Sequence, residues 1–151
     1  MARTNLGPLI SEHRGKIKKE VKNLLSIAAN ESVNFFTENF RRQGFLDRSL
    51  SKWKKRKKNV DPGRGVLIGK ANRGGRGSRL YRSIARGRTT KNEAVIGVKG
   101  KAAVYAGVHN AGLRAGRGKG FKMPKRQFIG RSKKLDDKIT RLISRRISKI
   151  F

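Results

Sequence analysis

The chain has 151 residues, of which 40 are Lys or Arg and 9 are Asp or Glu, so its formal net charge is +31. This length suits one domain, the 35% of apolar residues limit the core, and the unbalanced positive charge predicts a polyanionic partner, nucleic acid above all. The absence of cysteine excludes disulfides and thiolate metal sites, and no apolar run is long enough to span a bilayer, so we expect a soluble protein made in a cytosol without membrane contacts.

The first 43 residues predict an arm followed by a helix. Residues 1–15 are expected to be an extended N-terminal arm because Gly7-Pro8 interrupts a helix, and residues 16–151 are expected to be one domain. Residues 16–43 predict a long helix, which Gly44 should end. The apolar stripe that indicates this helix consists of Ile17, Val21, Leu24, Leu25, Ala28, Phe35, Phe36 and Phe40.

One face of this helix differs from the rest of the chain. No Lys or Arg occurs from Asn23 to Phe40, where Glu31 and Glu38 stand among asparagines. This face is either the ordinary wetted side of a core helix or a surface that meets the basic face of another copy. The sequence leaves both alternatives open.

A basic block follows the helix. Trp53 is expected to anchor it to a small apolar patch with Phe45 and Leu46, while the neighbouring cations stay in water. Residues 48–88 contain fifteen Lys or Arg residues but only one acid, Asp61. Residues 54–79 should form a long, mobile loop, because glycine, arginine and lysine offer little apolar surface to offset the cost of ordering.

The second half predicts short elements and a final helix. Residues 78–85 indicate a short helix that Ser78 caps, and residues 94–98 and 102–109 indicate two strands joined as an antiparallel hairpin. Residues 112–120 form a second Gly/Arg-rich loop that is expected to be mobile. Residues 134–151 predict an amphipathic helix with acids in its first turn and bases in its last. The predicted fold class is therefore α+β, with a small antiparallel sheet packed against the long N-terminal helix and the C-terminal amphipathic helix, and with long basic loops.

Residues 104–130 carry a recognisable signature. A YA–HNAG segment is followed by a variable loop and by MPKRQFIG, in an order that resembles the bacteriophage virion-morphogenesis, or tail-completion, family. This chain is far more basic than we would expect of that family. The residues that carry the resemblance are Tyr105, His109, Asn110, Gly112, Met123, Pro124, Arg126, Phe128 and Gly130.

The resemblance implies a structural protein of a tailed phage or prophage. Such a protein would be a homo-oligomer, a neck ring of six subunits or of the connector's symmetry, that completes the tail or joins it to the head. Its partners would be connector or adaptor proteins and tail tube or terminator proteins. Its location would be the virion, and the host cytoplasm during assembly.

No catalytic site is expected. Only two histidines are present, and the carboxylates are scattered, so we predict no metal, no cofactor and no enzyme activity. Asp136 and Asp137 are neighbours on a helix and point about 100° apart, which prevents a catalytic pair.

The basic residues are the candidate contacts for double-stranded DNA phosphates. They would line the channel of a ring, or, if they face outward, they would meet acidic surfaces of neighbouring virion proteins. The alternative is a free-standing nucleic-acid-binding protein of the ribosomal or nucleoid type, although few aromatic residues are available for base stacking. The candidates are Lys54, Lys55, Arg56, Lys57, Lys58, Arg64, Arg73, Arg76, Arg79, Arg114, Arg117 and Lys119.

Overall fold

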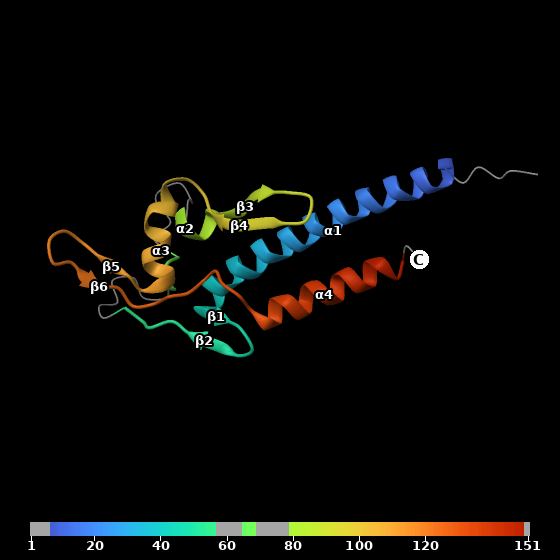
Figure 1. Cartoon of the computed structure of the whole chain (residues 1–151). Coiled ribbons are helices and arrows are strands. Elements are labelled where there is room, and N and C mark those ends of the chain that lie inside the picture. Colours follow the sequence, from blue (N-terminus) through green and yellow to red (C-terminus); the bar gives the residue numbers. More distant parts are fainter. Residues whose placement is uncertain (1–6, 57–64, 69–78, 150–151) are drawn as a thin grey trace, which may run out of the picture.

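The computed structural model describes residues 7–56, 65–68 and 79–149, and its architecture is α+β, as predicted (Figure 1). Within these residues, two long helices are accompanied by three separate two-stranded antiparallel sheets rather than by one sheet. In chain order the elements are α1 (Gly7–Arg42), β1 (Gly44–Leu46), β2 (Leu50–Lys52), α2 (Arg79–Arg82), β3 (Ile84–Thr89), β4 (Ala94–Val98), the 3-10 turn η1 (Gly100–Ala102), α3 (Ala103–Ala111), β5 (Arg114–Ala115), β6 (Phe121–Lys122) and α4 (Lys133–Ile147).

Helix α1 begins earlier than predicted. It starts at Gly7, so the expected extended arm is wrong for residues 7–15, and residues 1–6 lie outside the described part. Pro8 does not interrupt the helix because it stands in the first turn, where backbone N–H groups have no partner within the helix. Proline there also fixes a backbone angle that the helix requires.

The end of α1 uses Gln43 rather than Gly44. Gln43 adopts the left-handed conformation, with φ of 53°, and its side-chain amide hydrogen-bonds the carbonyl of Phe40 and the backbone of Val66. Gly44 instead begins β1, where an added Cβ would lie 2.5 Å from the carbonyl oxygen of Ser51. The glycine therefore permits the close pairing of β1 with β2.

Helices α1 and α4 lie side by side and run in opposite directions (Figure 1). Lys138 of α4 pairs with Glu31. Arg146, in the last turn of α4, pairs with Glu20 at 3.7 Å. Glu38 pairs with Arg41 within α1. Both acids of residues 23–40, Glu31 and Glu38, are thus paired within the chain itself.

The predicted hairpin of residues 94–98 with 102–109 is wrong. β4 pairs instead with β3, in the register Ile84↔Val98 and Arg86↔Ile96, and residues 103–111 form helix α3. Alternating apolar residues fit either structure, but three alanines in this segment favour a helix. In a buried strand the side chain of Val104 would point into the core, but in α3 it is 87% exposed.

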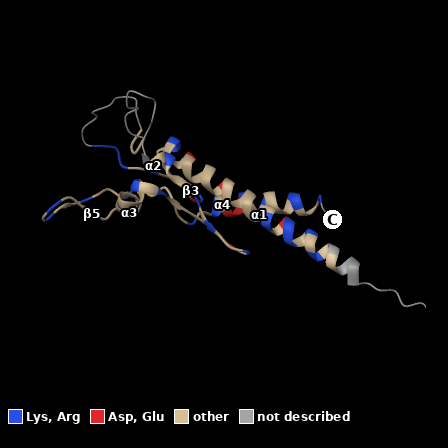
Figure 2. Cartoon of the chain, turned by 90° about the horizontal axis from the view of Figure 1, so that it is seen from above, with Lys and Arg blue, Asp and Glu red and all other residues tan. Residues whose placement is uncertain are grey.

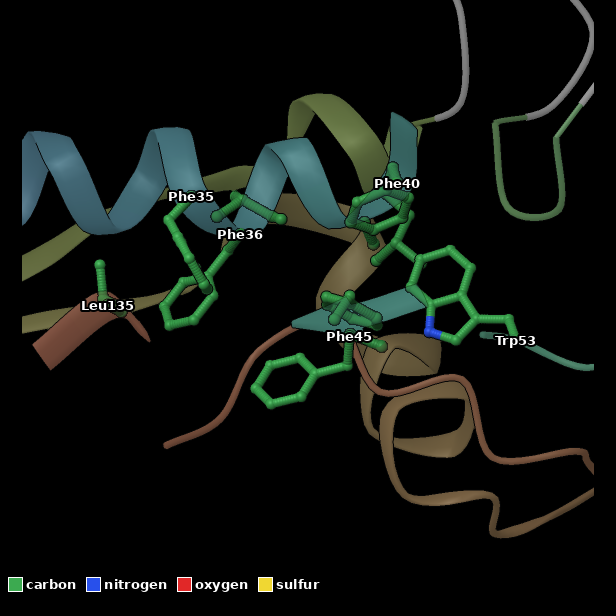
Figure 3. Close-up of a cluster of buried hydrophobic side chains, with 11 residues drawn as sticks. Phe35, Phe36, Phe40, Phe45, Trp53 and Leu135 are labelled. Atoms are coloured by element: carbon green, nitrogen blue, oxygen red, sulfur yellow. The ribbon is translucent and has the colours of Figure 1, made fainter. Parts of the chain in front are cut away.

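The core is an aromatic cluster around Phe40, which is fully buried (Figure 3). The ring of Phe40 packs edge-on against Trp53 and Tyr81, with centroids 5.3 and 5.7 Å apart, and lies 5.1 Å from the ring of Phe128. Burying each large ring contributes about 2–3 kcal/mol. The cluster draws residues from α1, the segment after β2, α2 and the segment before α4 into one core.

Only the C-terminal half of α1 reaches this core. Phe35, Phe36 and Phe40 are buried, whereas Ile17 and Val21 of the same predicted stripe are 54% and 42% exposed. The β3–β4 hairpin and α4 lie on opposite sides of α1, as Figure 1 shows. The first turns of α1 extend beyond both.

Candidate nucleic-acid interface

The family signature forms a junction between α3 and the extended segment that precedes α4. Tyr105, His109 and Asn110 stand on α3, and Gly112 follows it with φ of 72°. The backbone N–H of Arg126 donates to the carbonyl of His109 at 2.8 Å, which joins the two halves of the signature. The structure therefore brings together the two motifs that the sequence places on either side of a loop.

Asn110 makes the central contacts of this junction. Its Oδ1 accepts the backbone N–H groups of Phe128 and Ile129 at 2.8 and 3.0 Å, and its Nδ2 donates to the carbonyl of Ile129 at 3.1 Å. On the other side, Asn39 of α1 donates to the carbonyl of Phe128 at 3.1 Å. Asn39 was not predicted from the sequence, although an asparagine between Phe36 and Phe40 is a usable signal.

Gly112 and Gly130 both stand where the chain comes close to itself. A Cβ on Gly112 would lie 2.9 Å from the backbone nitrogen of Lys125, and one on Gly130 would meet the side chain of Gln127. Met123 and Pro124 are half-buried, and the N–H of Met123 donates to the carbonyl of Leu113 at 3.1 Å. These residues close the base of the segment that lies between the two motifs.

That segment is a short hairpin arm. The predicted loop of residues 112–120 contains β5, which pairs with β6 just beyond the loop. In this pairing Arg114 lies opposite Lys122, and Ala115 lies opposite Phe121. The predicted loop therefore contains a short strand, and its mobility stays a prediction. The arm extends away from the body of the molecule (Figure 1).

The arm carries exposed cations and no acid. Arg114, Arg117 and Lys119, all predicted contacts, are exposed, and Arg114 donates to the carbonyl of Lys119 at 2.6 Å. Lys122, which was not among the predicted contacts, is also exposed and stands opposite Arg114. The periodicity of a two-stranded arm would have identified it.

The basic run after β2 leaves the core beside the base of this arm. Trp53 anchors the run, as predicted: it is buried, and its Nε1 donates to the carbonyl of Gln127 at 2.7 Å. Arg126 donates from Nε and Nη2 to the carbonyl of Lys54 at 3.2 and 3.1 Å. The signature segment thus positions Lys54, and the exposed Lys55 and Arg56 follow it.

The buried groups at this junction are surrounded by positive charge. Burial, and then repulsion from Arg56, lowers the pKa of Arg126. Burial also lowers the pKa of His109 below its usual 6.5, and Arg126 lowers it further. The ring of His109 packs edge-on to Tyr105, and its Nδ1 is buried without a hydrogen-bond partner.

The remaining predicted contacts are not placed. Lys57, Lys58, Arg64, Arg73 and Arg76 lie outside the described residues, and Arg79 is described only as the first residue of α2. Figure 2 shows cationic segments on the β5–β6 arm and on the chain that runs into the grey trace at the same end of the molecule. The structure therefore places residues 54–56 and the arm at the same end of the molecule.

Neither a metal site nor a membrane span is found in the described residues. No three His, Asp or Glu side chains there are grouped so that they could hold a metal ion. None of the helices in that part of the chain is long and apolar enough to cross a bilayer.

Comparison with known proteins identifies the family. Residues 48–148, more than half of the chain, match the model of the phage virion morphogenesis family. The chain belongs to this family. The match covers both halves of the signature and everything from the β1–β2 turn to the end of α4, so the resemblance seen in the sequence is confirmed.

Membership in the phage virion morphogenesis family makes this a bacteriophage protein of virion assembly. No curated protein and no solved structure matches the chain. The whole of α1 lies before the matched residues.

Proposed function

We propose that the chain is the subunit of a ring at the neck of a tailed phage, which completes the tail or joins it to the head, and that its basic arm faces the DNA channel. The observation that carries the proposal is the β5–β6 arm, which projects from the body and exposes Arg114, Arg117, Lys119 and Lys122, with no acid in residues 112–122. Arginine and lysine on such an arm suit contacts to phosphates without sequence preference.

The surface beside the arm suits contact between subunits. Val104 on α3, Leu113 and Phe121 are 87%, 53% and 59% exposed, so a neighbouring subunit could bury their apolar surface. A shallow cavity of about 260 Å³ lies on α3 beside Ala106 and Gly107. A neighbour in a ring of six, or of the connector's symmetry, would cover this surface.

Because each subunit is strongly positive, assembly of the ring should depend on a negatively charged partner. Subunits of +31 repel one another, and Glu20, Glu31 and Glu38 of α1 are already paired within the chain. DNA in the channel would supply negative charge, and connector and tail tube or terminator proteins would supply further contacts. Ring formation should therefore be promoted by DNA or by these neighbours.

Titration of DNA binding tests the role of the arm. The full chain is titrated with short duplex DNA over a range of salt concentrations, beside Arg117→Gln/Lys119→Gln. If both side chains contact phosphates, the slope of log affinity against log salt should fall by about 2 in the double variant. The charge-matched control is Lys99→Gln/Lys101→Gln, in the exposed turn before α3, which should leave the slope unchanged.

Mass measurement and electron microscopy test the ring. The wild-type chain should form closed rings with DNA or with its connector and tube proteins. A chain that remains monomeric under all these conditions while it binds DNA tightly would instead support a free-standing nucleic-acid-binding protein. An unchanged slope in the arm variant would contradict contact between the arm and DNA phosphates.

A further inference from the structure

The end of the molecule away from the arm contains a groove that the proposed ring function does not use. It lies between the N-terminal half of α1 and the tip of the β3–β4 hairpin and has a volume of about 710 Å³. Ile17 and Val21 contribute apolar surface to it, and both are more than 40% exposed. Exposed aliphatic side chains in a concave site indicate a binding surface.

The rim of this groove is basic. Lys18 and Lys22 line it from α1, and Arg86 and Lys91 line it from the hairpin. All four are exposed, and no lining residue is acidic. The groove therefore combines an apolar floor with a positively charged rim.

The hairpin wall of the groove is held in place by its own hydrogen bonds. The N–H of Thr90 donates to the carbonyl of Glu93 at 2.8 Å, and the N–H of Glu93 donates to Oγ1 of Thr90 at 3.1 Å. Thr89 pairs with Ala94 just inside the turn. This wall is therefore formed before a partner binds, which lowers the entropic cost of binding.

We propose that this groove binds an acidic amphipathic helix of another virion protein. Apolar residues on one face of such a helix would cover Ile17 and Val21, and its acids would meet the lysines and arginine of the rim. Burial of the aliphatic floor gives affinity, and charge complementarity gives selectivity and a fast encounter.

A second copy of this chain does not fit the groove. The longest stretch without Lys or Arg, residues 23–40, packs into the core through Phe35, Phe36 and Phe40. Its acids Glu31 and Glu38 are paired within the chain. Nucleic acid fits the rim but not the floor, because Ile17 and Val21 offer neither stacking rings nor groups that bind phosphate.

The probe is a labelled synthetic peptide of about 18 residues, long enough to form a helix, with leucines on one face and glutamates on the other. Binding to the full chain is followed by fluorescence anisotropy. Lys18→Glu/Lys22→Glu should weaken binding by about tenfold, and Val21→Thr, which keeps the side-chain shape, by about threefold. A peptide of the same composition in scrambled order should bind at least about tenfold more weakly to the wild type.

Matched variants separate the groove from general charge attraction. Lys99→Glu/Lys101→Glu changes the net charge by the same amount at exposed positions outside the groove, and Val95→Thr alters a valine that is 55% exposed and does not line it. Both controls, and the arm variant Arg117→Gln/Lys119→Gln, should change peptide affinity by less than about twofold. The arm variant also keeps this test independent of the proposed ring.

Three outcomes would overturn the inference. Equal losses in the groove and control variants would reduce the binding to non-specific attraction. Equal affinity for the ordered and scrambled peptides would remove the role of the apolar floor. Duplex DNA that displaces the peptide, and whose own affinity falls about tenfold in Lys18→Glu/Lys22→Glu but not in the control, would make the groove a nucleic-acid site.

Discussion

Oδ1 of Asn110 accepts a hydrogen bond from the backbone N–H of Phe128 at 2.8 Å. One side chain on α3 therefore holds a residue of the aromatic core in place. The same carboxamide binds both backbone groups of Ile129. Phe128 itself is 1% exposed and packs on Phe40. The hydrogen bonds of the signature and the packing of the core are therefore parts of one structure.

Removal of the Asn110 side chain should destabilise the protein strongly. Asn110→Ala leaves two N–H groups and one carbonyl without their partner, and we expect a loss of about 3 kcal/mol in the free energy of unfolding. Urea denaturation measures it. Asn34→Ala, at an exposed position on α1, is the control and should stay within about 0.5 kcal/mol. Equal losses in both variants would contradict the role given to Asn110.

Gly107 and Gly112, inside and just after α3, should respond in opposite directions to replacement by alanine. Gly112→Ala places a Cβ 2.9 Å from the nitrogen of Lys125 at a φ of 72°, so we expect a loss of at least about 1–2 kcal/mol. At Gly107, inside α3, a Cβ meets nothing within 4 Å, so Gly107→Ala should stabilise the protein by about 0.5–1 kcal/mol. Thermal melting of both variants tests the pair, and stabilisation by Gly112→Ala would contradict the structure.

Ser132 should be the most sensitive serine of α4. Its Oγ accepts the N–H of Leu135 at 3.2 Å as the N-cap and donates to the carbonyl of Leu46 at 2.8 Å. Ser132→Ala should cost about 1–2 kcal/mol in the free energy of unfolding. Ser144→Ala, at an exposed position in the same helix, should change it by less than about 0.5 kcal/mol. Denaturation curves of the two variants that coincide would exclude the capping role.

The stability of the protein should fall as the pH decreases below about 6.5. The pKa of His109 is lowered in the folded state, so between that lowered pKa and 6.5 the unfolded chain binds more protons than the folded chain. The contribution of neutral His109 is complete above pH 6.5 and decreases as the pH falls through this window. Melting temperatures measured from pH 7.5 to 5 should show the decrease.

Replacement of the two histidines isolates this effect. His109→Gln should flatten the pH dependence between 7 and 5, whereas His13→Gln, at an exposed position on α1, should leave it in place. A slope that persists unchanged in His109→Gln would assign the pH dependence to other groups.

Sequence reasoning succeeded where one pattern had one structural solution. The periodicity of residues 16–43 and 134–151 predicted both long helices, and the lone Trp53 predicted the anchor of the basic run. It failed at residues 102–109, where the alternation of Val104, Ala106 and Val108 fits a strand and an alanine-rich helix equally. The helix preference of alanine decided this case, because only Ala106 of α3 is buried and packing therefore contributes little.

The candidate site was partly predictable for the same reason. The motifs containing Asn110 and Phe128 were identified from the sequence, but their hydrogen bonds depend on a fold that brings together residues 18 positions apart. Gly7-Pro8 was misread because a proline that interrupts a helix and one that begins a helix differ only in position. The pairing of the α1 acids required the orientation of α4, which no local pattern specifies.

The uneven burial of α1 has a consequence for its dynamics. A helix of 36 residues is about 54 Å long, yet its buried aromatic residues all stand in the last third. Backbone amides near Phe40 should exchange with deuterated solvent only when the whole protein unfolds, whereas amides near Gly15 should exchange through local opening. The rate should therefore rise steadily along this single helix toward its first turn.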